Sequence, residues 1–401
     1  MKIRMALFFG LLLAAWLALF WGYRHNPVLI DERWHAPQVQ RFSQGDFSLD
    51  PELSMTPGYH ALAGAVVFVV GDDSLAMIRL VTLLGSFAGV VFFYRIVGQL
   101  WPQERWVRTA QFAFFPLFFP FLFLAYSDVW GVVFLLGAVD AALRKKAGWC
   151  ALALAVAVVI RPPAILWGWL LWVMVAGDLR EAKRGWPWLR QVLRQTWPLL
   201  LVAAGFWAFV VWNGGVAIGP RDKMPVSCYP TNVWFFLGLV AIFFPVQCGR
   251  AVGVIWARGR RTVWQVLGGV VGLWLIFGAT FHLAHIFNRI NMDYMIHNIV
   301  LYQVATQPWA RLVALAILPL GLSGWLFTPL AQERLRWMGL VAVVSVLVIP
   351  HIDPRYYLPA FALFLAFREP LSRRVEWTMT VLYAIGAAVL TSSSFRLLYF
   401  P

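Results

Sequence analysis

The sequence predicts an all-α polytopic membrane protein with about 13 transmembrane helices and a shorter helix in the first outer loop. Of its 401 residues, 61% are hydrophobic and 13% are charged, and the mean hydropathy is +0.72. A soluble domain contains roughly 45–50% apolar residues. The apolar residues also come in long runs, and about 20 of them make one helix that crosses a bilayer. Little of the chain remains for a soluble domain.

The candidate spans are apolar runs of helical length, some of them short or interrupted by proline. They lie at residues 5–22, 76–94, 109–125, 129–143, 148–160, 164–176, 197–212, 233–248, 263–281, 310–328, 338–350, 358–367 and 377–391. The run 58–70 is apolar too, but its roughly 13 residues suit a juxtamembrane helix better than a span. We therefore expect a single transmembrane domain over residues 1–401, with residues 23–75 as its first outer loop. Residues 1–23 resemble a signal peptide without a cleavage site, and we expect a retained helix.

The charge distribution predicts the orientation. With the N-terminus inside the cell, most of the 33 Lys and Arg residues fall in short cytoplasmic segments, including Arg144–Lys146, Arg258–Arg261 and Arg368–Arg374. Positive charge collects on the cytoplasmic side of membrane proteins. The net charge of +15 therefore indicates orientation and contact with anionic membrane lipids, and not nucleic-acid binding, which would need a soluble basic surface.

Several common functional patterns are missing from the sequence. Cys150, Cys228 and Cys248 lie far apart and match no metal-ligand spacing. There are no internal repeats, Gly-rich phosphate loops or GxSxG elbows. An enzyme that uses a soluble nucleotide sugar would normally carry a cytoplasmic folded domain with a nucleotide-binding motif. A lipid-linked donor requires no such domain.

The polar segment 31–57, DERWHAPQVQRFSQGDFSLDPELSMTP, follows the first apolar helix and holds five of the 18 acidic residues. Asp31 and Glu32 are adjacent carboxylates, and His35 lies one turn further on. A group just outside a helix end is both anchored at the membrane and exposed to water. We therefore take Asp31 and Glu32 as candidate catalytic acids, with a merely solvated loop as the alternative.

Further polar residues fall on the same outer face in the predicted topology, in several different loops. Ionisable groups at membrane depth are costly and usually face the bundle interior or a cavity, so we expect these loops to form one outward-facing site. The alternatives are a structural ion pair or helix cap for Arg79 and Asp128, and an interfacial position for His282 and His285. The remaining residues of this face are Arg161, Arg221, Asp222, Lys223, Arg289, Asp293, His297, His351, Asp353, Arg355, Tyr356 and Tyr357.

The first loop resembles that of the alpha-1,2-glucosyltransferases that add the last glucose to the dolichol-linked oligosaccharide. That family shows a D-E-x-x-H-x-P-Q-x-Q run, a W-D-P and a T-P-P-G in this order. Here the matching residues are Asp31-Glu32, His35, Pro37-Gln38-x-Gln40, Asp50-Pro51 and Thr56-Pro57-Gly58. Weaker collinear matches are 114–129, 161–167, 219–245 and 353–357. The family's D-N-R-H-Y run is absent after His297, one proline of T-P-P-G is missing, and the Arg161 motif lacks its Asn.

The resemblance implies the fold of the multi-span transferases of type C (GT-C) and a polyprenyl-phosphate sugar donor. Transfer needs a base for the acceptor hydroxyl and positive charge on the departing phosphate. Asp31 is the first choice for the base and Glu32 the close alternative, while Arg355, Arg161 and Lys223 are the phosphate candidates. We expect no cofactor and no metal. The substrate-binding candidates are His35, Asp50, Arg79, Asp128, Arg161, Asp222, Lys223, His351, Arg355 and Tyr356.

The predicted function is thus the transfer of a hexose, glucose in the first place, to a glycan or lipid-linked acceptor on the non-cytoplasmic face. One alternative is a related transferase that moves mannose, aminoarabinose or another sugar onto lipid or protein. Another is a transporter of lipid-linked sugar, although repeats and interrupted mid-membrane helices would then be expected. A noncatalytic scaffold would need no convergent acids and bases. The short loops and the absence of N-x-S/T sequons favour a bacterial inner membrane.

Overall fold

The computed structural model describes residues 2–177, 185–219 and 227–401, and the regular secondary structure in these ranges is helical apart from two isolated bridges. The α-helices are α1 (Lys2–Tyr23), α2 (Glu32–Ser43), α3 (Gly58–Val70), α4 (Leu75–Leu100), α5 (Arg105–Ala113), α6 (Ser127–Leu143), α7 (Ala147–Ile160), α8 (Gly168–Ala176), α9 (Trp186–Asn213), α10 (Pro230–Phe243), α11 (Pro245–Ala257), α12 (Arg260–Thr280), α13 (Ile296–Thr306), α14 (Pro308–Phe327), α15 (Trp337–Leu347), α16 (Leu358–Phe367) and α17 (Arg373–Phe395). The 3₁₀ turns are η1 (Phe119–Phe123), η2 (Pro162–Trp167), η3 (Ile286–Asn288), η4 (Glu333–Arg336) and η5 (Pro354–Tyr357).

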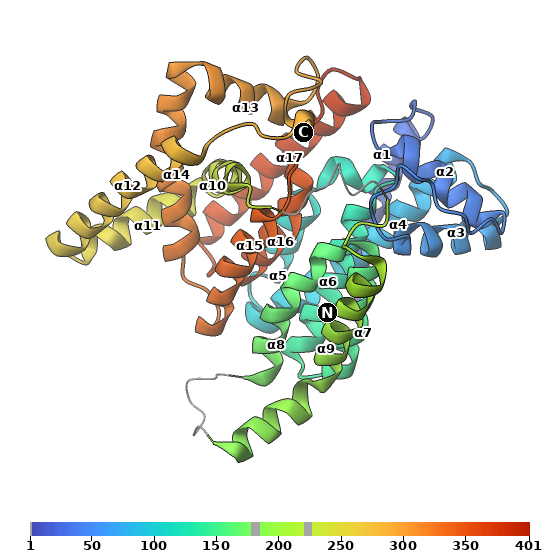
Figure 1. The fold of residues 1–401 in the computed structure, drawn as a ribbon, viewed down its shortest axis with the longest axis horizontal. Helices are drawn as coiled ribbons and strands as arrows, with labels where there is room; N and C mark the ends of the chain where they lie inside the picture. The colour runs from blue at the N-terminus through green and yellow to red at the C-terminus, as the bar shows by residue number, and fades with distance from the viewer. Residues whose placement is uncertain (1, 178–184, 220–226) are drawn as a thin grey trace. The chain divides into compact units, whose positions relative to one another are not determined.

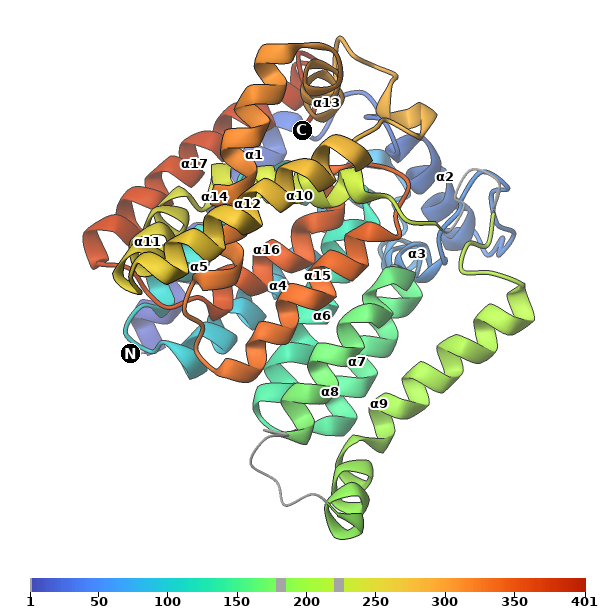
Figure 2. The ribbon, with the colours of Figure 1, turned by 60° about the vertical axis from the view of Figure 1, so that its left-hand side comes forward.

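The chain divides into two compact units. The first consists of Met1–Lys223 and Arg373–Arg396, and the second of Met224–Ser372 and Leu397–Pro401. Within the first unit, α6, α7, α8 and α9 lie side by side, and α2 and α3 lie against each other beside α4 (Figures 1 and 2). The expectation of a single domain over the whole chain stays a prediction.

Six described helices are long and apolar enough to cross a membrane: α1 from Ile3, α4, α9, α12, α14 and α17. The helices α10 and α11 would make a seventh candidate if counted together, although they meet at 96°. The expected all-α polytopic class is therefore confirmed, and the protein is a multi-pass membrane protein. The predicted number of about 13 spans is not reached by this criterion, because α3, α7 and the segment Pro162–Ala176 are shorter apolar helices.

Two predicted spans are not continuous helices. The segment 109–125 contains the end of α5, an irregular stretch at Pro116 and the turn η1 with Pro120. Proline lacks the N–H that a helix interior needs, and its ring clashes with the preceding turn. The segment 233–248 is interrupted for the same reason, because α10 ends at Phe243 and α11 begins at Pro245. The helix at 58–70, by contrast, has the predicted bounds.

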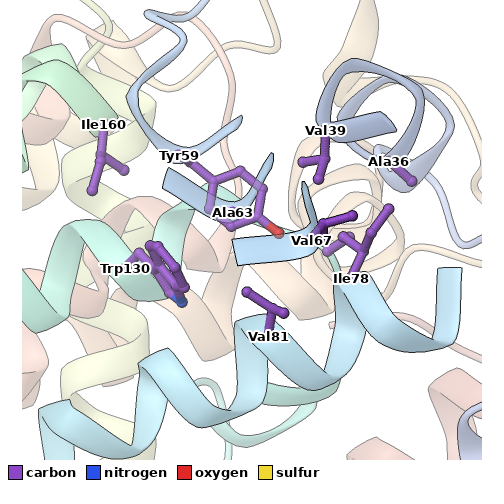
Figure 3. Packing of buried hydrophobic residues seen from close by; sticks show 10 residues of the cluster. Ala36, Val39, Tyr59, Ala63, Val67, Ile78, Val81, Trp130 and Ile160 are labelled. Atoms are coloured by element: carbon purple, nitrogen blue, oxygen red, sulfur yellow. The ribbon is translucent and has the colours of Figure 1, made fainter. Parts of the chain in front are cut away.

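A buried apolar cluster packs α2 and α3, the helices of the first loop, against the rest of the first unit (Figure 3). It consists of Ala36, Val39, Tyr59, Ala63, Val67, Ile78, Val81, Ala125, Trp130 and Ile160. The helix α3 approaches its neighbours closely at two glycines. A Cβ on Gly58 would lie 2.4 Å from the carbonyl oxygen of Val159, and one on Gly64 would lie 2.9 Å from Cβ of Phe42. Both positions therefore leave no room for a larger residue, and the loop is packed as part of the unit.

The predicted orientation can be tested within the first unit by one-sided cysteine labelling. Phe47 in the first loop is 76% exposed and Lys146 at the α6–α7 turn is exposed, so cysteine at either position should react. Cys228 is exposed and is replaced by serine in the background, while Cys150 and Cys248 are buried. A membrane-impermeant maleimide added outside sealed cells should label Phe47→Cys and spare Lys146→Cys until detergent is added. Labelling of both from one side would contradict the predicted topology.

Candidate active site

Glu32, at the start of α2, is completely buried and forms a two-pronged ion pair with Arg79 of α4. Nε of Arg79 donates to Oε1 at 2.9 Å, and Nη2 donates to Oε2 at 2.6 Å. The backbone N–H of Leu29 donates to Oε2 at 2.9 Å, and that of Ala125 donates to Oε1 at 2.8 Å. Because each carboxylate oxygen accepts two hydrogen bonds, Glu32 joins α2 to α4 and to the segment that precedes α6.

The turn that precedes α2 is held in a strained conformation. Ile30 has φ = +42°, which is unusual for a β-branched residue and costs on the order of 1–3 kcal/mol. Arg79 stabilises the turn, since it also donates to the carbonyl of Asn26 at 2.8 Å and to that of Pro27 at 2.9 Å. The strain and these bonds together fix the position of the next residue, Asp31.

Asp31 lies at the N-terminal boundary of α2 and is half-buried. Its N–H donates to the hydroxyl of Tyr126 at 3.1 Å, and its carbonyl accepts from the N–H of His35 at 3.1 Å. The first N–H groups of a helix favour negative charge nearby. Asp31 is thus a carboxylate of known position with partial access to solvent, unlike its neighbour Glu32.

His35 and His60 form a buried pair behind this turn. Nδ1 of His35 lies 2.8 Å from Nε2 of His60, and the two rings stack with centroids 5.1 Å apart. His60 belongs to α3, whose adjacent Tyr59 shares a hydrogen bond of 2.6 Å with the hydroxyl of Thr82. The indole N–H of Trp130 donates to the carbonyl of Thr82 at 3.1 Å. The pair thus joins α2 to α3, and hydrogen bonds connect α3 to α4 and α4 to α6 beside it.

Asp128 and Arg161 form a second ion pair in the first unit. Nη2 of Arg161 lies 2.5 Å from Oδ1 of Asp128, and Arg161 remains 18% exposed while Asp128 is 3% exposed. Ser127 donates to the sulfur of Met55 at 3.2 Å, which brings the end of the first loop beside this pair. Arg79 and Asp128 are thus both in ion pairs, as the structural alternative predicted, but each has a different partner.

The first loop folds back onto α2 through Gln38. Its Nε2 donates to the carbonyl of Ser48 at 2.8 Å, and its Oε1 accepts from the N–H of Asp50 at 2.7 Å. Asp50 Oδ1 accepts from the N–H of Glu52 at 2.9 Å. The observed contacts of the Asp50 carboxylate therefore stabilise a turn of the loop.

In the second unit, Asp353 and Arg355 bind each other at the turn η5. Nε and Nη2 of Arg355 donate to Oδ2 of Asp353 at 2.9 and 2.7 Å, and the backbone N–H of Arg355 donates to Oδ1 at 2.9 Å. Burial by itself raises the pKa of the Asp353 carboxyl, but Arg355 and His297 outweigh this effect and hold the pKa below its ordinary value. The guanidinium of Arg355 is consequently held in one orientation.

Asn232 organises the rest of this turn in the second unit. Its Nδ2 donates to the carbonyls of Ile349 and His351 at 2.6 and 3.0 Å, and its Oδ1 accepts from the hydroxyl of Tyr357 at 2.6 Å. The ring of His351 packs on that of His285 with centroids 4.4 Å apart. Two of the predicted histidines are thus brought together although 66 positions separate them in the sequence.

The structure brings together the predicted residues Asp31, Glu32, His35 and Arg79, and in the other unit His351 with Asp353 and Arg355. Asp222 and Lys223, like Arg221, lie outside the described residues. Sequence reasoning missed His60, Tyr126 and Asn232, because each acts through a partner distant in sequence. In the sequence, only their position in or next to the motifs 56–58, 114–129 and 219–245 distinguishes them. No three His, Cys, Asp or Glu side chains among the described residues could hold a metal ion.

These features define a class: a multi-pass helical membrane protein whose first loop packs into the molecule and places a half-buried carboxylate at a helix N-terminus. The comparisons with known proteins give the particular family. The chain matches the DIE2/ALG10 family over residues 25–187 and 178–366, and it belongs to that family.

Individual relatives are more distant. The sequence is 25% identical over 315 residues to a rat protein, covering 63% of this chain and 65% of the relative. It is 21% identical to a human protein, covering 84% and 82% of the two chains, and 22% identical to one from Kluyveromyces lactis, covering 85% and 73%. All three are named Dol-P-Glc:Glc(2)Man(9)GlcNAc(2)-PP-Dol alpha-1,2-glucosyltransferase. The match spans slightly less than two thirds of the rat relative's length.

Among solved structures, the chain is similar to ArnT from Cupriavidus metallidurans. The crystal structure bound to undecaprenyl phosphate gives a TM-score of 0.44 at 13% identity, covering 97% of this chain and 79% of ArnT. The structure in the apo state gives a TM-score of 0.43 at 16% identity, covering 99% and 76%.

Proposed function

We propose that the protein is a GT-C-type membrane glycosyltransferase that moves a hexose, glucose in the first place, from a polyprenyl-phosphate donor to a glycan or lipid-linked acceptor. The observation that carries this proposal is the family match over residues 25–187 and 178–366. The curated relatives are named as alpha-1,2-glucosyltransferases that use Dol-P-Glc. The arrangement of the first loop supports the same function, since it places the half-buried carboxylate of Asp31 at the N-terminal boundary of α2.

Asp31 is the proposed base. A general base must have a lone pair that can reach the acceptor hydroxyl. Each oxygen of Glu32 accepts two hydrogen bonds, and its side chain is fully buried against Arg79. Proton uptake by Glu32 would therefore break a buried ion pair. Asp31 is half-buried, and its position is fixed by Tyr126 and the strained turn, so it fits the role better.

The departing phosphate needs positive charge, and we propose that arginine supplies it without a cofactor or metal. Arg161 and Arg355 are each held by one carboxylate, Asp128 and Asp353 respectively. Each guanidinium is oriented by its carboxylate partner in this way. Lys223 stays a candidate from the sequence alone.

We propose that the site faces the periplasmic or outer side of a bacterial inner membrane, as the predicted charge distribution and short loops favour. A transferase for another sugar on lipid or protein remains the runner-up. The experiment that separates these functions is a transfer assay with purified protein and a panel of polyprenyl-phosphate sugars. We expect turnover of polyprenyl-phosphate glucose in the presence of a lipid-linked glycan. Binding of the donors without any transfer would contradict the enzymatic proposal and favour a transporter.

The proposed phosphate contacts predict the behaviour of two conservative variants. Arg161→Lys and Arg355→Lys keep a positive charge opposite the buried carboxylate but lose the planar guanidinium, which can hold a phosphate through two parallel N–H groups. We expect kcat/KM for the donor to fall roughly tenfold to a hundredfold, which corresponds to the loss of about 1.5–3 kcal/mol from one charge-assisted bond. Arg95→Lys is the matched control, because Arg95 pairs with Asp140 near the predicted cytoplasmic face. If both test variants turn over like Arg95→Lys, the phosphate site lies elsewhere.

A further inference from the structure

The buried pair His35–His60 shares one proton between its two facing ring nitrogens. Both side chains are buried, with 1% and 0% exposure, and the two ring nitrogens that face each other lie 2.8 Å apart. A hydrogen bond of this kind holds one proton between the rings, so one nitrogen donates and the other accepts. Two protonated rings would place like charges side by side in a buried site. The question is which ring donates.

The other nitrogen of His60 decides this question. Among the residues that the structure describes, no group forms a hydrogen bond with the buried Nδ1 of His60. If His60 accepted through Nε2, its proton would be on Nδ1 and would form an orphaned buried N–H, which is rarer in proteins than an unsatisfied acceptor. If His60 instead donates through Nε2, Nδ1 carries only a lone pair. The geometry therefore favours His60 as the donor and Nδ1 of His35 as the acceptor.

We propose that His60 is a positioning residue that fixes His35 as the Nε2–H tautomer, an inference that rests on the proposed transferase function. His35 accepts from His60 at Nδ1, so its single proton is at Nε2, on the opposite edge of the ring. That edge is a hydrogen-bond donor and cannot accept a proton. His35 consequently holds the oxygen of the acceptor hydroxyl by donating to it, while the proton of that hydroxyl passes to the Asp31 carboxylate.

The surroundings of the pair fit this division of roles. His35 follows Asp31 by one helical turn, and its ring packs against those of Tyr59 and Tyr126. The hydroxyl of Tyr126 accepts from the backbone N–H of Asp31. Of the charged groups on the packed elements, Glu32 pairs with Arg79 and Asp128 pairs with Arg161, while Asp31 lies at the start of the same helix as His35. The hydrogen bond with His60 thus decides which ring nitrogen of His35 carries the proton.

The test compares His60→Leu with His60→Gln in the full chain. Glutamine places an amide N–H close to the position of Nε2 and can still donate to His35, whereas leucine removes the donor and keeps the bulk. Nitrogen NMR of ¹⁵N-histidine-labelled protein, with His35→Asn to assign the signals, reports the tautomer directly. We expect His35 to carry its proton on Nε2 from pH 5.5 to 8.5 in the wild type and in His60→Gln. In His60→Leu we expect a mixture of the Nδ1–H and Nε2–H tautomers of His35, because no donor then occupies its Nδ1.

Activity gives the second readout. In His60→Leu we expect kcat to fall about tenfold with the donor KM unchanged, while His60→Gln stays close to the wild type. A wild-type His35 with its proton on Nδ1 would overturn the inference, as would an unaltered tautomer in His60→Leu. If leucine prevents folding, the wild type and His60→Gln still decide the tautomer. If no sugar is transferred at all, the proposed function fails, but the NMR result on His60 stands by itself.

Discussion

Asp31→Asn is expected to lower the rate constant of sugar transfer by about 10²–10⁴-fold, which is the usual contribution of a general base. Asparagine keeps the size of the side chain and most of its hydrogen bonds but cannot take the proton of the acceptor hydroxyl. The protein should stay folded and bind the polyprenyl-phosphate donor with little change in affinity. Single-turnover transfer and donor binding, measured on the same preparation, separate the two effects.

The first loop offers a matched control for this experiment. Asp46 is exposed, and its Oδ1 accepts from the N–H of Ser48 at 2.9 Å, a bond that asparagine can also make. Asp46→Asn should therefore transfer sugar at the wild-type rate. Near-normal turnover of Asp31→Asn with a verified substrate would show that the base is another group. If Glu32→Gln were inactive but still folded, the assignment would move to Glu32.

Arg79→Met is expected to destabilise the protein by about 3–5 kcal/mol, the typical effect of removing one partner from a buried ion pair. The variant leaves the Glu32 carboxylate buried with only two backbone N–H donors and releases the carbonyls of Asn26 and Pro27. Thermal or denaturant unfolding in detergent measures the loss. The double variant Arg79→Met with Glu32→Gln should recover part of it, because no uncompensated charge remains.

Arg33→Met serves as the control for this variant. Arg33 lies on the same turn of α2 as Glu32 but is exposed, packs over the ring of Trp34 and donates through Nε to the carbonyl of Ile30 at 2.8 Å. Its replacement removes one exposed hydrogen bond and should change the free energy of unfolding by at most about 1 kcal/mol. An Arg79→Met protein as stable as Arg33→Met would mean that the buried pair contributes nothing to the fold.

The sequence predicts most accurately the helices that consist of long runs of apolar residues. The helix 58–70 was found with its bounds because an apolar run begins after Pro57 and ends at Gly71. The helix α2 was missed, because it is polar and contains Pro37, so that hydropathy gives no signal. Its buried positions do follow a helical period, but they include Glu32, His35 and Gln38.

The sequence identifies the polar residues of the candidate site but not which acidic residue binds which basic one. Residues 32 and 79, and likewise 128 and 161, were both singled out from their polarity in an apolar chain, yet nothing local states which acid binds which base. Such pairs depend on packing between helices distant in sequence. The role of His60 could not be predicted for a related reason, since a single histidine in an apolar helix does not indicate that the ring of His35 lies beside it.

The right angle between α10 and α11 has a consequence for the bilayer itself. If α10 follows the membrane normal, the 13 residues of α11 run sideways for about 20 Å at 1.5 Å per residue. This helix exposes Trp256 and Arg250, side chains that suit the boundary between lipid tails and headgroups. In that orientation α11 lies within a single leaflet. Lateral pressure in that leaflet then acts on α11, so its packing should depend on the headgroup size of the surrounding lipid.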